Sequence, residues 1–174
     1  MAKNLPDRTN WTDPSDPTDR SRANPPCSHH TGVMSGELAV YVHIPFCHYH
    51  CSFCDFATVV GQPARIPAYV EAVIAELALR LENRPPPLVP TVFFGGGTPS
   101  TLDPSHILTI MDALRAACIL APDAEITLEA NPGNQPPGFW EALLAAGITR
   151  VSVGVQSLDD AVLQGVGRLH TGAE

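Results

Sequence analysis

The sequence YVHIPFCHYHCSFCDF, residues 41–56, joins an alternating apolar segment to three closely spaced cysteines. Cys47, Cys51 and Cys54 follow the spacing CxxxCxxC. An ordinary iron–sulfur cluster binds four thiolates, so a compact set of three indicates a [4Fe-4S] cluster with one iron left without a protein ligand. An open iron of this kind is a site for chemistry.

Two other interpretations of the three cysteines are open. Structural zinc usually binds two close pairs of Cys or His separated by a longer loop, and no second pair follows here. His48 and His50 offer nitrogen ligands, but both lie inside the same tight loop, where closing a tetrahedron would be strained. Disulfides fit least well, because three cysteines cannot pair evenly. The spacing therefore favours the cluster over a zinc-stabilised binding module.

Strands and helices are predicted to alternate along the chain after the first apolar segment. Alternation and apolar runs predict strands over residues 38–44, 91–94, 125–130 and 149–155. Apolar spacings of three and four predict helices opening at Pro67 and at Asp103–Pro104, and a third over residues 138–146. This alternation implies parallel pairing with right-handed crossovers, hence an α/β sheet or barrel. In such barrels the functional site lies at the C-terminal ends of the strands.

Glycine-rich and polar residues follow these predicted strands. GGGTPS, residues 95–100, lacks the Lys-Ser/Thr pair of a P-loop, but its glycines permit a close backbone approach to a ligand. Glu129 stands at an inward strand end, where a carboxylate needs a cationic or hydroxyl partner. Tyr41 lies opposite the aliphatic residues of its strand, toward a barrel interior if those residues pack on helices. A plain tight turn and ordinary core aromatics are the structural alternatives.

Four motifs in this order resemble those of the radical S-adenosylmethionine (SAM) superfamily. They are YVHIPFC with the CxxxCxxC spacing, GGGTPS at 95–100, LEANP at 128–132 and VSVGVQS at 151–157. Within the superfamily the chain resembles the oxygen-independent coproporphyrinogen III oxidase family from about Leu38 onward. Porphyrinogen-oxidising members carry a further cysteine two residues after the third ligand, where this chain has Phe56, as in the heme-chaperone branch. The resemblance implies a heme chaperone, with coproporphyrinogen III oxidase as the alternative.

The resemblance also implies a role for each motif. Cys47, Cys51 and Cys54 would bind three irons of the [4Fe-4S] cluster, and SAM would chelate the fourth through its amino and carboxylate groups. The positions that match SAM-bordering residues of the family are Tyr41, Phe53, Gly96, Gly97, Thr98, Glu129, Gln156 and Arg168. For Arg168, a solvated surface arginine is the alternative.

The implied chemistry belongs to the cofactor rather than to the protein. An electron from a flavodoxin-like donor would cleave SAM and release a 5′-deoxyadenosyl radical. In the heme-chaperone branch, heme and a heme-accepting protein are the implied partners, and the cluster and SAM would serve heme transfer or its regulation.

Composition bounds the remaining function classes. The 174 residues carry a net charge of −8, so no basic stripe exists to neutralise nucleic-acid phosphates. No apolar stretch approaches the length of a membrane span, and thiols kept reduced for iron fit a cytoplasmic setting. A hydrophobic content of 44% is enough for one packed domain.

The chain is predicted to have two parts. Residues 1–36 are rich in proline and polar residues and predict a disordered N-terminal extension, with Met34 as an alternative translation start. For residues 37–174 the resemblance implies the N-terminal portion of a radical SAM core, a partial parallel (β/α) barrel truncated after about four strands. We expect such a fragment to be inactive alone and to leave an apolar edge unpaired. Cys27 in the extension and Cys118 on a helix stripe are expected to bind no iron.

Overall fold

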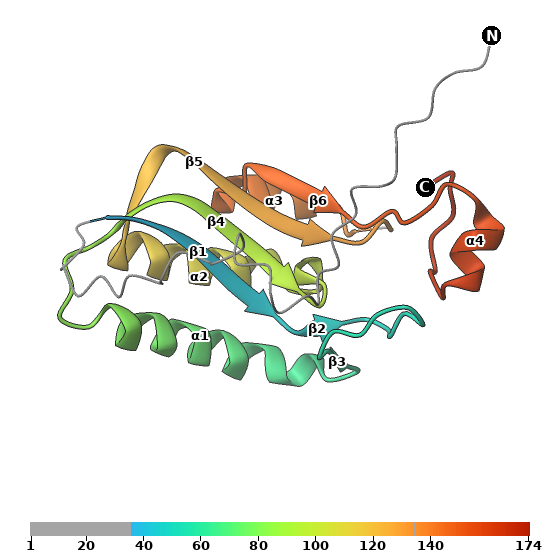
Figure 1. Ribbon diagram of the computed structural model, residues 1–174, viewed down its shortest axis with the longest axis horizontal. Coiled ribbons are helices and arrows are strands. Elements are labelled where there is room, and N and C mark those ends of the chain that lie inside the picture. The colour runs from blue at the N-terminus through green and yellow to red at the C-terminus, as the bar shows by residue number, and fades with distance from the viewer. Residues whose placement is uncertain (1–35, 134) are drawn as a thin grey trace, which may run out of the picture. The chain divides into compact units, whose positions relative to one another are not determined.

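The central feature of the fold is an open sheet of four parallel strands. The computed structural model describes residues 36–133 and 135–174. In them the strand order is β1-β4-β5-β6, and all three neighbouring pairs are parallel (Figure 1). The strands are β1 (Glu37–Ile44), β4 (Leu88–Gly96), β5 (Ile119–Ala130) and β6 (Arg150–Val153). The predicted α/β class, parallel pairing and open, partial barrel are confirmed. Most of the predicted N-terminal extension, Cys27 included, lies outside the described residues.

Three helices connect these strands and lie on one side of the sheet (Figure 1). They are α1 (Ile66–Leu81), α2 (Pro104–Ala117) and α3 (Phe139–Ala146). Asp103 is the N-cap of α2, as predicted, because its Oδ1 accepts a hydrogen bond of 2.9 Å from the backbone N–H of Ser105. A short fourth helix, α4 (Asp160–Gly165), follows β6 and is capped by Asp159.

The hydrophobic core lies between these helices and the sheet. Along β1, Val42 and Ile44 are buried against the helices, whereas Tyr41 on the other face is exposed. Burying one large aliphatic side chain contributes about 1.5–3 kcal/mol, so this single covered face supplies most of the apolar stabilisation. Cys118 belongs to this core, and burial raises the pKa of its thiol. Its position agrees with the expectation of a structural thiol.

Two central strands are longer than the sequence predicts. β4 begins at Leu88 and β5 at Ile119, both upstream of the predicted starts. The pairing register between them is irregular near Pro90 in β4 and Pro122 in β5. Proline has no N–H to give to a ladder, so the regular part of each strand begins only after it.

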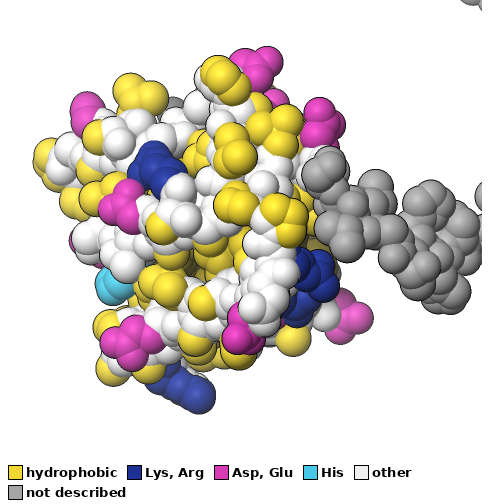
Figure 2. Space-filling view, turned by 90° about the vertical axis from the view of Figure 1, so that its left-hand side faces the viewer, with side chains coloured by type: hydrophobic (Ala, Val, Ile, Leu, Met, Phe, Trp, Pro, Cys, Tyr) yellow, Lys and Arg dark blue, Asp and Glu magenta, His cyan; other side chains and the backbone are white. Residues whose placement is uncertain are grey.

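The C-terminal ends of the strands lie together at one end of the sheet (Figure 1). Each of the four motifs begins in the last part of a strand and continues past its end. The cysteine loop leaves β1 through a second small sheet, β2 (Phe46–Cys47) paired with β3 (Val59–Val60). At the opposite end of the sheet, hydrophobic side chains are interspersed with acidic and basic ones (Figure 2). Within residues 36–133 and 135–174, no helix has the length and apolar character to cross a membrane.

Candidate functional site

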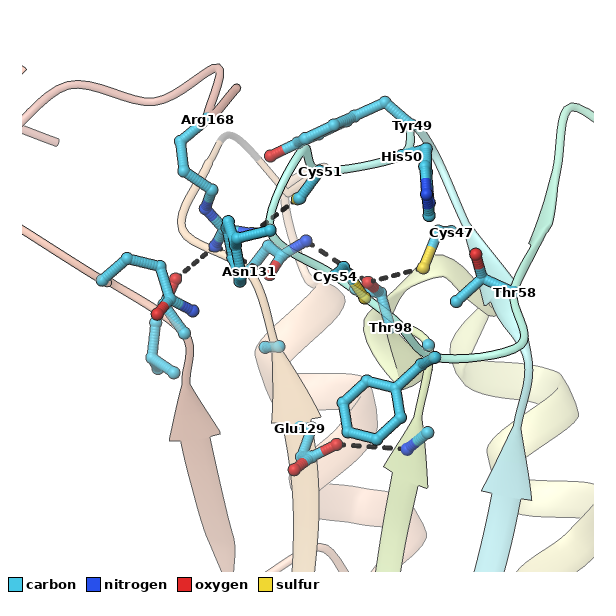
Figure 3. Close-up of a pocket in the computed structure, with 18 of the residues that line it drawn as sticks. Cys47, Tyr49, His50, Cys51, Cys54, Thr58, Thr98, Glu129, Asn131 and Arg168 are labelled. Carbon is cyan, nitrogen blue, oxygen red and sulfur yellow. Dashed lines mark hydrogen bonds between the residues drawn. The ribbon is translucent and has the colours of Figure 1, made fainter. Parts of the chain in front are cut away.

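A pocket of about 200 Å³ opens at the C-terminal ends of the strands (Figure 3). The predicted site residues that line it are Cys47, Cys51, Phe53, Cys54, Gly96, Gly97, Thr98, Glu129, Gln156 and Arg168. Tyr41 is the exception, because it lies on the open face of the sheet, 59% exposed and stacked on Phe93. The structure thus brings together ten of the predicted residues, which come from five separate segments, and places Tyr41 outside the pocket.

The three cysteines reach the pocket from the loop after β1. All three are free thiols; Cys51 is buried, and Cys47 and Cys54 are half-buried. A hydrogen bond of 3.1 Å from the backbone N–H of Cys54 to the carbonyl of Cys51 tightens the loop. Its base is held by the backbone N–H of Thr98, which donates to the carbonyl of Phe46 at 2.8 Å. The loop is therefore anchored to the end of β4.

The glycine loop after β4 packs directly on the backbone of the cysteine loop. A Cβ on Gly97 would lie 2.8 Å from the carbonyl oxygens of Pro45 and Phe46, so no side chain fits there. The N–H of Gly96 donates to Oε2 of Glu129 at 3.2 Å, which holds that carboxylate on the pocket wall. The glycine-rich motif predicts a close backbone approach to a ligand; the close approach in the structure is to the cysteine loop.

Arg168 is buried, 7% exposed, and joins three walls of the pocket. Its Nη2 donates to Oδ1 of Asn131 at 2.9 Å and to the carbonyl of Gly154, and its Nη1 lies 3.6 Å from Sγ of Cys51. Its Nε is buried and has no partner within the described part of the chain. The alternative of a solvated surface arginine is wrong. A buried donor left unsatisfied is costly, so the position of this guanidinium is not explained by its contacts within the described residues alone.

Asn131 is a pocket residue that the sequence prediction missed. Its Nδ2 donates to Oγ1 of Thr98 at 3.3 Å, and the same Oγ1 lies 3.4 Å from Sγ of Cys47 (Figure 3). Asn131 directly follows β5, and its place at a strand end in LEANP was a signal that could have found it. Tyr49 and Thr58 also line the pocket, but no sequence pattern singles them out.

The surroundings shift the pKa of two groups, one in the pocket and one on the open face of the sheet. Burial raises the pKa of the Cys47 thiol, and the hydrogen bond with Thr98 partly offsets that effect. Burial, followed by the negative charge of Glu129, raises the pKa of Tyr41. The Glu129 charge therefore acts on the open face of the sheet as well as in the pocket.

The pocket residues fit a [4Fe-4S] cluster with SAM. Three thiols, glycine backbone groups, a carboxylate and a buried guanidinium line one space. Across residues 36–133 and 135–174, no group of three or more His, Cys, Asp or Glu is close enough to hold a single metal ion. Zinc needs four ligands around one point, whereas a cluster spreads its thiolates over separate irons. The zinc-stabilised alternative thus finds no formed site in the described residues.

Several curated proteins are similar to this chain. Heme chaperone HemW of Mycobacterium tuberculosis (strain ATCC 25618 / H37Rv) is 42% identical over 144 residues, which cover 79% of this chain and 36% of the relative. Heme chaperone HemW of Escherichia coli (strain K12) is 38% identical, over 76% of this chain and 35% of its own length. The mitochondrial radical S-adenosyl methionine domain-containing protein 1 of Mus musculus is also 38% identical, over 80% of this chain and 32% of its own length. The chain spans about a third of the length of these relatives.

A solved structure and a family profile agree with these similarities. The coproporphyrinogen III oxidase HemN from Escherichia coli, described as a radical SAM enzyme, superposes with a TM-score of 0.72 and 31% identity. The superposition covers 79% of this chain and 32% of that one. The profile of the radical SAM superfamily, whose members use a [4Fe-4S] cluster and SAM, matches residues 41–174. The chain therefore belongs to the radical SAM superfamily.

Proposed function

We propose that this chain is the cluster- and SAM-binding part of a heme chaperone. Cys47, Cys51 and Cys54 hold the [4Fe-4S] cluster. The observation that carries the proposal is the convergence of these thiols, the glycine loop, Glu129 and Arg168 on one pocket at the strand ends. The choice of a heme chaperone rests on relatives of that name at 33% to 42% identity, and on Phe56 where porphyrinogen-oxidising members carry cysteine.

The pocket offers opposite charges for the two ends of SAM. SAM bound with the cluster supplies radical chemistry, which the protein binds and orients. The buried guanidinium of Arg168 lines the pocket and is a cationic partner for a carboxylate, and the Glu129 carboxylate is an acceptor for ribose hydroxyls or a partner for a sulfonium charge. Gly96 and Gly97 line the same pocket and bring polar backbone atoms to it for the amino group. Gln156 and Phe53 line the same space and complete the set.

A second candidate is oxygen-independent coproporphyrinogen III oxidase. The structural similarity to HemN at a TM-score of 0.72 is the observation that favours it. Phe56 disfavours the oxidase function, because this exposed side chain lies at the pocket where the oxidising members have a thiol. A cytoplasmic location and a flavodoxin-like electron donor belong to the proposal in either case, and a heme-accepting protein belongs to the heme chaperone.

Two assays on the full-length gene product test the proposal. Anaerobic reconstitution should give about four irons and four sulfides per chain, as a cubane cluster requires. Titration with hemin should then give a saturable change of the Soret absorption, with no conversion of coproporphyrinogen III in the presence of SAM and reductant. Turnover of coproporphyrinogen III without hemin binding would overturn the chaperone in favour of the oxidase.

A further inference from the structure

We propose that Asn131 is a positioning residue that directs the Thr98 hydroxyl toward Cys47, so that a hydrogen bond to this thiolate raises the reduction potential of the cluster. The chain of contacts runs from Arg168 through Asn131 and Thr98 to Cys47 (Figure 3). This inference rests on the cluster assignment proposed above. It adds a role for two side chains that bind no iron.

Arg168 fixes the donor-to-acceptor direction of these hydrogen bonds. A guanidinium only donates hydrogen bonds, so its Nη2, at 2.9 Å, must face the oxygen of the Asn131 amide. The two ends of an amide are otherwise hard to tell apart, and here the cation decides between them. Arg168 is itself held by the Gly154 carbonyl and is buried. The Nδ2 of Asn131 is therefore turned toward Thr98, at 3.3 Å from its Oγ1.

The Thr98 hydroxyl then has one proton to donate. A hydroxyl carries one donor and two acceptor sites, and the contact with Asn131 uses an acceptor site. Sγ of Cys47 lies 3.4 Å from Oγ1, within hydrogen-bond distance for sulfur, and a thiolate can only accept. Thr98 is 5% exposed, so bulk water competes little for this proton. The geometry thus gives the Cys47 sulfur a fixed hydrogen-bond donor.

Hydrogen bonds to the sulfurs of an iron–sulfur cluster are one of the factors that set its potential. Reduction adds negative charge, and a donor at the sulfur stabilises that charge, so the donor makes reduction easier. Cys51 has Nη1 of Arg168 at 3.6 Å, and Cys47 is connected to the same guanidinium through two side chains. One buried cation thereby acts on two of the three cluster ligands.

Redox titration of the cluster-loaded full-length protein, followed by electron paramagnetic resonance (EPR), tests this role. Thr98→Val removes the hydroxyl with little change in shape, and Thr98→Ser keeps it as the matched control. We expect about tenfold less reduced cluster at a given potential for Thr98→Val, about 59 mV for a one-electron couple. Thr98→Ser should titrate close to the wild type. A Thr98→Val potential equal to that of the wild type would overturn the inference.

Asn131→Asp tests the relay itself. Aspartate keeps an acceptor for Arg168 but places a second acceptor where Nδ2 donates, so the Thr98 proton turns away from Cys47. Asn131→Asp should therefore lower the reduction potential more in the protein that has Thr98 than in the protein that also carries Thr98→Val. In the second protein only the added negative charge acts on the cluster. Equal shifts in both backgrounds would overturn the hydrogen-bond relay from Asn131 through Thr98 to Cys47.

If Thr98→Val holds no cluster, Asn131→Leu carries the test, and a wild-type potential in that variant would overturn the inference. Failure of the unchanged protein to bind a cluster would instead contradict the proposed function.

Discussion

The helix-covered core and the strand-end pocket are equally buried in places but differ in chemistry. In the core, Phe94 and Leu128 have no exposed surface and contact apolar neighbours. In the pocket, Thr98 and Arg168 are 5% and 7% exposed, and Nε of Arg168 has no partner in the described part of the chain. Native cores keep buried polar groups paired, so the pocket departs from the rule that the core obeys. The fold is stabilised under the helices, and the strand ends retain polar groups for binding.

The two regions also use cysteine differently, and this difference gives the largest expected effect. Cys51→Ala should abolish the cluster, because one of three ligands is lost; Cys47→Ala and Cys54→Ala should do the same. Cys118→Ala, in the core, is the matched control and should retain the cluster. The measurement is the iron content and the absorption near ~400 nm that such clusters show. An unchanged spectrum in Cys51→Ala would contradict the ligand assignment.

The second prediction concerns the core alone. Leu128→Ala should lower the free energy of unfolding by about 2–5 kcal/mol, because it removes a fully buried side chain and leaves a cavity. Leu144→Ala, at a site on α3 that is 70% exposed, should change it by less than about 0.5 kcal/mol. Urea unfolding of both variants measures the difference. Equal losses would show that the helix-covered face does not carry the stability.

The third prediction compares two glycines, one at the pocket and one at the end of α3. Gly97→Ala would place a Cβ 2.8 Å from the cysteine-loop backbone, so we expect SAM affinity to fall about tenfold, or about 1.4 kcal/mol. Gly147 ends α3 at φ +104°, and its Cβ would lie 2.6 Å from Nη2 of Arg115. Gly147→Ala should cost about 1–3 kcal/mol of stability and leave SAM affinity unchanged. Calorimetric titration and urea unfolding of both variants check this, and a reversed pattern would contradict the division.

The smallest effect is expected at the N-cap of α2. Hydrogen bonds from Ser105 lower the pKa of the Asp103 carboxyl below its ordinary value. The cap therefore stabilises the fold above the unfolded pKa of about 3.9, and this contribution is lost as the pH falls through the lower, folded pKa. Asp103→Ala should cost about 1 kcal/mol near neutral pH and less in acid, whereas Asp103→Asn should show little pH dependence. Urea unfolding at several pH values distinguishes the variants; a constant Asp103→Ala cost would contradict the charged cap.

The regular elements could be predicted from the sequence because their signals are local. The alternation along β1, the Asp103 cap and the glycine after α3 each depend on a few neighbouring residues. The pocket depends on contacts across the chain, such as Arg168 with Cys51, 117 residues apart. No local pattern predicts the burial of Arg168 or the contact of Asn131 with Thr98. Two-residue strands such as β2 carry no period at all.

The most direct test of the three-cysteine site is EPR spectroscopy of the reduced, reconstituted full-length protein with and without SAM. Three cysteine ligands leave one iron open, so SAM should bind that iron and change the spectrum of the cluster. The Cys118→Ala protein should give the same response, because its change lies in the core. A [4Fe-4S] spectrum that SAM leaves unchanged, or a reconstituted protein that contains zinc in place of iron and sulfide, would contradict the assignment.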